Sequence, residues 1–149
     1  MMHDFFEVKI RYEKVLEDGK NKLVTESYLL DALSFSEAEK RIIEEMKPYI
    51  NGEFTVSAIK RSNYTEIFPC DNDKADKWYK VKLNLITLEE KTGGEKKQAV
   101  YNLVQAESVG DARIRFDERM KGSVMDYEIE SISETKIFDV FPFKELKSA

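Results

Sequence analysis

The sequence predicts an α+β fold made by tandem duplication of a β-β-α-β(-β) unit, and three observations carry that prediction. An internal repeat relates the two halves of the 149-residue chain. Each half opens with two segments in which apolar and polar residues alternate, the pattern of a β-hairpin. Each half then has one apolar stripe at helical spacing. One helix per repeat, packed on one face of an antiparallel sheet, is typical of α+β folds.

The repeat extends over most of the chain with a single one-residue slip. Phe6-Glu7-Val8-Lys9-Ile10 corresponds to Tyr79-Lys80-Val81-Lys82-Leu83, and the segment 66–69 corresponds to 139–142. Between them, five further residues recur, namely Ser34, Ala38, Arg41, Glu44 and Met46 as Ser108, Ala112, Arg115, Glu118 and Met120. A polar linker joins the two repeats. When it is divided between them, the first repeat comprises residues 1–73 and the second comprises residues 74–149. Because each repeat is too small to be secure alone, we expect both to pack as one compact body with approximate two-fold symmetry.

The hairpins are predicted from alternation and from turn residues. In the first repeat, apolar residues alternate over 6–12 and again over 24–30, and Gly19 lies in the polar turn between them. In the second repeat the strands are 79–85 and 100–106, with Gly93 in the turn. Glycine suits both turns because it adopts positive φ at little cost.

A helix follows each hairpin. Ser36 with Glu39 has the spacing of a capping box, which predicts Ser36 as the N-cap, and Gly110 takes that place in the second repeat. The apolar stripe of the first helix is Ala38, Ile42, Met46 and Tyr49, and that of the second is Ala112, Phe116 and Met120. We expect glycines 52 and 122 to lie where the helices end.

A third strand follows each helix, and a fourth closes each repeat. The last two apolar residues of the third strand are three apart in both copies, Val56 and Ile59 in the first and Ile129 and Ile132 in the second. Strict alternation would place them two apart, so the spacing predicts a β-bulge or a strand end. The segments 64–69 and 136–142 are predicted as fourth strands that end at a proline.

The segment 28–39, with the strand at 6–9 and the closing segment at 66–69, resembles the domain-of-unknown-function family numbered 4494. That resemblance covers essentially the whole chain and implies an origin in gut bacteria of the Bacteroides group or in their phages. It brings no activity and no catalytic residues. The segment 28–39 also has a structural explanation, since it ends a strand and opens a helix.

Composition excludes several classes of protein. The chain has 42% hydrophobic residues, which is too many for a disordered protein, and a formal charge of −5, which argues against a generic nucleic-acid coat. No apolar run is long enough to cross a bilayer, and residues 1–5 do not look like a secretion signal. One cysteine, Cys70, cannot form an internal disulfide. We therefore expect a cytoplasmic protein that makes no contact with a membrane.

The sequence offers no recognisable catalytic, cofactor-binding or metal-binding site. The single histidine, His3, lies near the terminus, and Cys70 lies beside acidic residues that disfavour its thiolate. One cysteine and one histidine cannot supply the usual zinc ligand sets. The glycine pair 93–94 lacks the residues of a phosphate-binding loop. We therefore expect a protein that is not an enzyme and that needs no cofactor.

The leading interpretation is a non-enzymatic binding or assembly protein, which has a protein partner or associates with itself. The family resemblance adds an accessory role in a phage or mobile element. The first alternative is a single-stranded nucleic-acid-binding protein that uses a basic strand face in the second repeat. Its candidate residues are Lys80, Lys82, Lys96, Lys97 and Trp78. The second alternative is an enzyme with an unrecognised site.

Overall fold

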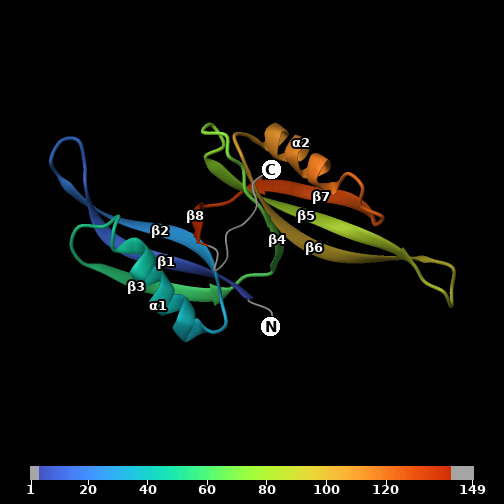
Figure 1. The fold of residues 1–149 in the computed structure, drawn as a ribbon, viewed down its shortest axis with the longest axis horizontal. Coiled ribbons are helices and arrows are strands. Elements are labelled where there is room, and N and C mark those ends of the chain that lie inside the picture. Colours follow the sequence, from blue (N-terminus) through green and yellow to red (C-terminus); the bar gives the residue numbers. More distant parts are fainter. Residues whose placement is uncertain (1–3, 142–149) are drawn as a thin grey trace. The chain divides into compact units, whose positions relative to one another are not determined.

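A computed structural model describes residues 4–141 of the chain. Those residues form two compact units, each with its own sheet and helix (Figure 1). Unit 1 contains residues 4–62 and 136–141, and unit 2 contains residues 63–135.

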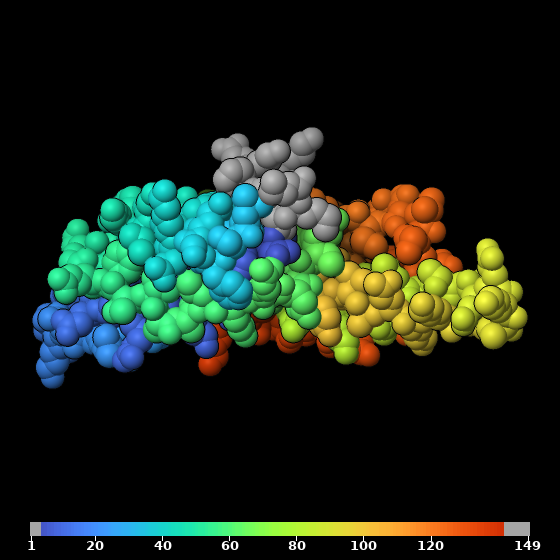
Figure 2. All heavy atoms as spheres, turned by 90° about the horizontal axis from the view of Figure 1, so that it is seen from below, coloured from blue at the N-terminus to red at the C-terminus, as the bar shows by residue number. Residues whose placement is uncertain are grey.

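Unit 1 is a four-stranded sheet with one helix on one face. Its elements are β1 (Asp4–Val15), β2 (Asn21–Ala32), α1 (Phe35–Met46), β3 (Phe54–Arg61) and β8 (Ile137–Phe141). The strand order is β3-β1-β2-β8, and all neighbours are antiparallel except β8, which runs parallel to β2. The helix packs on β1, β2 and β3, and Figure 2 shows α1 and β3 side by side on one face of the unit.

Unit 2 repeats this plan. Its elements are β4 (Tyr64–Phe68), β5 (Lys77–Leu88), β6 (Glu95–Ala106), α2 (Val109–Met120) and β7 (Asp126–Glu134). The strand order is β4-β6-β5-β7, and β4 runs parallel to β6. The helix packs on β6 and β7. The predicted α+β fold with a β-β-α-β unit in each half is therefore confirmed.

The fourth strand of each repeat is present, but it pairs with the hairpin of the other repeat. β8 closes the second repeat in sequence and pairs with β2, whereas β4 closes the first repeat and pairs with β6. The β2–β8 and β6–β4 pairings have equivalent registers. Asp139 lies opposite Tyr28, and their counterparts in the repeat, Glu66 and Asn102, also lie opposite each other. The compact units therefore differ from the sequence repeats by one exchanged strand. The expected two-fold packing of the repeats as one body stays a prediction.

Of the two predicted alternatives, a β-bulge or a strand end, a β-bulge is present at the same place in both sheets. Lys9 lies opposite Ala58 and Ile10 opposite Val56, so Ser57 is the additional residue in β3. In unit 2, Lys82 lies opposite Ser131 and Leu83 opposite Ile129, so Glu130 is the additional residue in β7. A bulge restores inward orientation to apolar residues that are three apart, which explains the spacing.

The predicted helix N-caps were wrong by two residues. The N-cap of α1 is Ser34, whose Oγ accepts a hydrogen bond from the Glu37 backbone N–H, while the Glu37 carboxylate accepts one from the Leu33 N–H. Ser36 is instead the second residue of the helix. In α2 the cap is Ser108 with Asp111, and not Gly110. The repeat itself held the signal, because serine occurs in both copies at 34 and 108 but not at 36 and 110.

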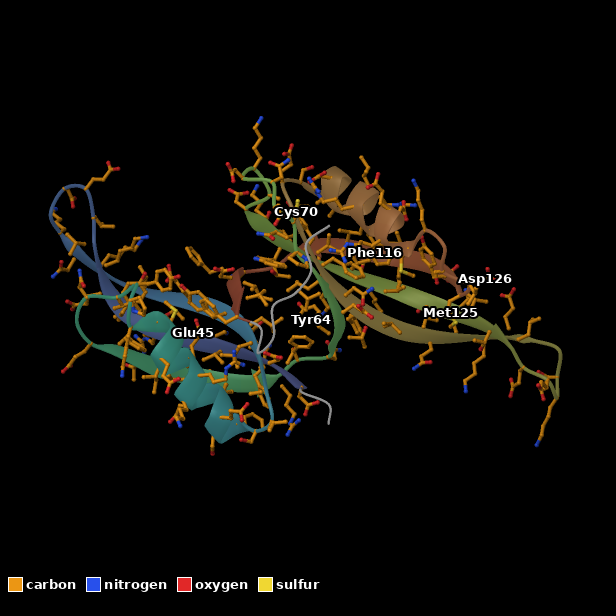
Figure 3. The ribbon with its side chains drawn as sticks, viewed as in Figure 1. Glu45, Tyr64, Cys70, Phe116, Met125 and Asp126 are labelled. Carbon is orange, nitrogen blue, oxygen red and sulfur yellow. The ribbon has the colours of Figure 1, made fainter. Side chains whose placement is uncertain are left out.

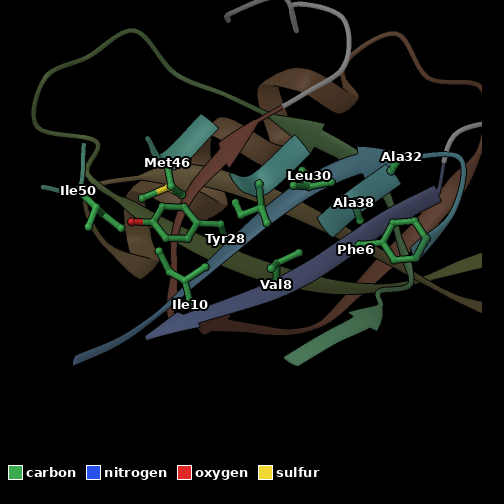
Figure 4. Packing of buried hydrophobic residues seen from close by; sticks show 10 residues of the cluster. Phe6, Val8, Ile10, Tyr28, Leu30, Ala32, Ala38, Met46 and Ile50 are labelled. Carbon is green, nitrogen blue, oxygen red and sulfur yellow. The ribbon is translucent and has the colours of Figure 1, made fainter. Parts of the chain in front are cut away.

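The helices bury most of the predicted apolar stripes, while Met120 in α2 is only partly buried and Tyr49 is exposed. Ala38, Ile42 and Met46 are buried in α1, and Figure 4 shows Met46 with Ile50 beside the ring of Tyr28. Tyr49 lies beyond the end of α1 and is 72% exposed, so its place in the stripe was wrong. In α2, Phe116 points from the helix toward the sheet (Figure 3), where it joins the buried cluster of unit 2.

Candidate binding pockets

Unit 1 has a pocket of about 260 Å³ between the end of α1 and the strands β1, β2 and β8. The exchanged strand β8 forms one wall, so the pocket exists only because that strand pairs with β2. Ten residues line it: Tyr12, Lys14, Glu26, Tyr28, Met46, Tyr49, Ile50, Phe138, Asp139 and Phe141. Most of the lining is aromatic or aliphatic, which is typical of ligand pockets.

Strand alternation places the polar groups of this pocket on the helix-covered face. Tyr12 follows buried Ile10 by two residues in β1, and Glu26 precedes buried Tyr28 by two residues in β2. Residues two apart on a strand share a face, so Tyr12, Glu26 and Tyr28 point to the same side. Glu26 lies directly opposite Ile10 in the hairpin register. The strands therefore hold a carboxylate at the edge of an apolar core.

Glu26 and the two tyrosines form a hydrogen-bonded cluster. The Tyr12 hydroxyl donates to Oε1 of Glu26 at 2.9 Å, and the Tyr28 hydroxyl donates to the same oxygen at 3.0 Å. Burial and this hydrogen bond raise the pKa of Tyr12 to about 12. Burial and the same carboxylate raise the pKa of Tyr28 further. Both phenols therefore keep their protons near neutral pH and continue to donate to Glu26.

Three aromatic rings make a continuous wall in this pocket. The Tyr28 and Phe141 rings are stacked, with centroids 5.5 Å apart and planes at 21°. The Tyr28 and Phe138 centroids are 5.6 Å apart, with planes at 58°. Phe138 is 61% exposed and Tyr49 is 72% exposed, so two aromatic side chains of the lining remain open to solvent.

Arg41 ties the helix to the strands that form the pocket. Its guanidinium donates to the Phe141 carbonyl in β8 at 3.2 Å. It also pairs with the Asp31 carboxylate at the end of β2, with 3.1 Å between Nη1 and Oδ1. Because one side chain contacts both strands, Arg41 helps to hold the exchanged strand β8 next to β2.

Unit 2 has a pocket of about 520 Å³ at the equivalent place, with different chemistry. Its lining includes Leu85, Val100, Asn102 and Met120, which correspond in the repeat to Tyr12, Glu26, Tyr28 and Met46. The exchanged strand β4 contributes Thr65, Glu66 and Phe68 where β8 contributes Phe138, Asp139 and Phe141. The duplication thus provides two related pockets, of which the first alone has the phenol–carboxylate cluster.

Asn102 and Arg119 give the unit 2 pocket its polar character. Asn102 is only 3% exposed, and its Oδ1 accepts a hydrogen bond from Thr65 Oγ1 at 3.0 Å. The Arg119 guanidinium lies over the Phe68 ring, 5.0 Å from its centroid. At these positions the pocket presents an amide and a guanidinium, beside the Glu66 carboxylate, and it lacks the two phenols and the buried-face carboxylate of unit 1.

The structure places the five predicted nucleic-acid-binding residues on and near the β5–β6 hairpin. Trp78 is 4% exposed, so its ring is not open for stacking on a base. Lys82 pairs with Glu130 at 2.5 Å and Lys97 pairs with Glu128 at 2.8 Å, whereas Lys80 lies over the Tyr101 ring at 4.7 Å. Lys96 is exposed at the start of β6. Nucleic-acid binding by this face stays a prediction.

The described residues hold few features of other kinds of site. Within residues 4–141, no three His, Cys, Asp or Glu side chains gather in a way that could hold a metal ion. Neither described helix is long and apolar enough to span a membrane. Cys70 is a partly buried free thiol, and its backbone N–H donates to the Gln105 side chain at 2.9 Å. His3 lies outside the described residues.

The family assigned by comparison is the one that the sequence resembles. Residues 4–143 match the family described as Domain of unknown function (DUF4494). The chain belongs to this family. The match spans both repeats. A search among curated proteins found no match to the chain.

Sequence reasoning missed the phenol–carboxylate cluster of unit 1, although a signal was present. Glu26 is charged at a strand position that alternation directs toward the core, where an apolar residue is expected. The second repeat supplies that apolar residue, Val100. A charged residue that one copy of a duplication keeps at a core-facing position indicates a local function or a local polar network.

Proposed function

We propose that this family member is a non-enzymatic binding protein that holds a protein partner at the pocket of unit 1. One observation carries the proposal, namely a pocket whose aromatic lining includes two strongly exposed rings, Tyr49 and Phe138. Exposed aromatic residues beside a pocket are enriched at protein–protein interfaces. Two of the most exposed large apolar side chains of unit 1 therefore border one pocket, and such a patch is suited to burial against a partner.

The electrostatics of the pocket favour binding over proton transfer. A general acid or base works best when its pKa lies near the working pH. Here the pKa of Tyr12 is raised to about 12 by burial and by Glu26, and that of Tyr28 is also raised. The phenols are therefore poor proton donors, and they keep their hydrogen bonds to the Glu26 carboxylate. An enzyme with another site remains the least supported alternative.

Site-specific photocrosslinking in the source cell tests this proposal. A photoreactive benzoyl-phenylalanine replaces Tyr49 in one variant and Val124 in a control, because Val124 is 97% exposed but does not line the pocket. We expect a discrete crosslinked protein from position 49 and none from position 124. The Phe138→Ser change in the first variant should abolish that product. Equal products at both positions, or no product at position 49, would contradict the proposal.

The cellular setting is a finer part of the proposal. The resemblance implies a Bacteroides-group bacterium or phage, and the composition fits a cytoplasmic protein with an accessory role in a mobile element. The genes beside this one test the setting. Neighbouring integrase, replication or packaging genes would support it, and a consistent chromosomal metabolic neighbourhood would contradict it.

Nucleic-acid binding is the second candidate, because Lys96 and Lys97 are both exposed at the start of β6. Its weakness is that Glu128 and Glu130 neutralise two of the candidate lysines. A labelled single-stranded oligonucleotide titrated at roughly 50 mM salt tests it, since phosphate contacts are strong at low salt. Salt-sensitive binding that Lys96→Glu removes would support this candidate. No binding under those conditions would exclude it.

A further inference from the structure

We propose that the pocket of unit 1 receives a cationic side chain, lysine or arginine, of its partner. This inference rests on the proposed binding function and names the chemistry that the pocket recognises. The recognition elements are the Glu26 carboxylate, the rings of Tyr28, Phe138 and Phe141, and the carboxylate of Asp139.

The charges that line the pocket favour a cation. Glu26 and Asp139 contribute two carboxylates, and Lys14, which is exposed, contributes one ammonium group. Both phenol hydrogen bonds to Glu26 end on Oε1, so the second oxygen, Oε2, keeps its lone pairs for a charged donor. A hydrogen bond between a carboxylate and a cationic donor is about twice as strong as a neutral one.

The aromatic wall favours the same class of ligand. A cation attracts the negative face of an aromatic ring, and the interaction is worth roughly 0.5–2 kcal/mol. Tyr28 stacks on Phe141 and contacts Phe138, so several ring faces or edges border one small space. Met46 and Ile50, which lie beside Tyr28 in Figure 4, offer an apolar surface for the methylene stem of lysine or arginine.

The size of the pocket also fits a side chain. Its volume of about 260 Å³ lies at or below the lower end of pockets that hold whole small molecules. A single extended side chain, anchored by a carboxylate at its tip, needs no larger space. The exposed rings of Tyr49 and Phe138 then remain available to the main chain that presents it.

The pocket of unit 2 supplies an internal contrast. At the positions of Tyr12, Glu26 and Tyr28 it has Leu85, Val100 and Asn102, and none of these carries a charge. Its charged lining residues are Glu66 and Arg119, whose formal charges cancel, and the Arg119 guanidinium repels a second cation. The same architecture therefore has one pocket suited to a cation and one that is not, and both can be observed in a single experiment.

An NMR titration of the full chain tests the inference. The probes are the Nα-acetyl methylamides of lysine and arginine, and the neutral controls are the corresponding derivatives of norleucine and citrulline. We expect saturable shifts of Tyr12, Tyr28 and Phe141 signals with the cationic probes, with dissociation constants on the order of millimolar. The neutral probes should bind at least about fivefold more weakly. Comparison of the dissociation constants of the lysine and arginine probes shows whether the pocket prefers an ammonium or a guanidinium group.

Three variants sharpen the result. Glu26→Gln should weaken cation binding about tenfold, and Glu66→Gln, the same carboxylate-to-amide change in the lining of the unit 2 pocket, should leave it unchanged. Lys14→Gln should strengthen it, because it removes the competing charge. Unchanged spectra outside the pocket confirm that each variant is folded.

Several results would overturn the inference. Equal shifts with norleucine, equal responses at Asn102 and Met120, or no response to either cationic probe would each do so. If position 49 gives a crosslinked product but neither cationic probe causes a response, the proposed binding function stands and only the inference of a cationic ligand is contradicted. If position 49 gives no crosslinked product and neither cationic probe causes a response, both the proposed binding function and the proposed cation preference are contradicted.

Discussion

Glu26 is the residue on which the chemistry of unit 1 depends. It lies on a strand face that points to the core, and it accepts hydrogen bonds from the hydroxyls of Tyr12 and Tyr28. A partly buried carboxylate without such partners would be costly, so the three residues are stabilised as a group. The second repeat avoids that cost by placing Val100 at the same position. The cluster is therefore a local polar exception on a strand face that otherwise carries apolar residues.

Replacing Glu26 with glutamine should make Tyr12 and Tyr28 easier to ionise. Burial raises the pKa of both phenols first, and the carboxylate raises it further by hydrogen bonding and charge. Glutamine keeps an acceptor and removes the charge, so the midpoint of Tyr12 should fall from about 12 toward its ordinary value of about 10. An alkaline titration of tyrosinate absorbance, assigned with Tyr12→Phe, measures the change.

The sign of the accompanying stability change follows from linkage. A phenol whose pKa is raised on folding stabilises the protein below its unfolded pKa, and that stabilisation is lost as the pH rises through the folded value. The wild-type chain should therefore lose stability between about pH 10 and 12 more steeply than Glu26→Gln. Tyr127, whose pKa burial and Asp117 raise in unit 2, should titrate identically in both proteins. A shift of Tyr127 alone would contradict this account.

At the scale of elements, alternation and turn glycines predicted the hairpins, and the spacing of three predicted a β-bulge or a strand end, of which the structure has the bulge. The helix starts were harder, because Ser34-Phe35-Ser36-Glu37-Ala38-Glu39 contains two overlapping capping boxes. A single copy does not distinguish them. The structure uses Ser34 with Glu37, and the second repeat uses Ser108 with Asp111. Comparing the copies would have selected the first box.

Removing the true cap should destabilise unit 1, and removing the neighbouring serine should not. Ser34→Ala deletes the acceptor for the Glu37 N–H and should cost about 1 kcal/mol in the free energy of unfolding. Ser36→Ala changes an exposed residue in the first turn and should have an effect within about 0.5 kcal/mol. Urea denaturation of both variants measures the difference. A larger loss for Ser36→Ala than for Ser34→Ala would refute the assigned cap.

At the scale of the whole molecule, the duplication predicted the order of elements but not the destination of the fourth strands. Local pattern shows that residues 64–68 and 137–141 are extended, since each has strand-forming residues before a proline. It does not show which sheet they join, because the two hairpins are similar enough that either edge could accept either strand. Tyr28 lies opposite Asp139, and Asn102 lies opposite Glu66. The two side chains differ in chemistry, but their backbones pair with the fourth strand in the same way.

The exchange of strands is what creates the candidate sites. Each pocket has one wall from a hairpin and another from the closing strand of the other repeat. The tyrosines and Glu26 of the first repeat therefore meet Phe138, Asp139 and Phe141 of the second. No inspection of one repeat alone brings these residues together, which is why the sequence predicted the core of each unit better than its pocket.

The central claim is that β8 completes the sheet of unit 1 and β4 that of unit 2. Nuclear Overhauser contacts between assigned aromatic rings test it most directly. The account predicts contacts between Tyr28 and Phe141, whose ring centroids are 5.5 Å apart, and between Phe68 and Phe116, at 6.1 Å. If each strand instead closed its own repeat, Phe68 would contact Tyr28 and Phe141 would contact Phe116. Observation of that second pattern would contradict the exchange and both pockets built on it.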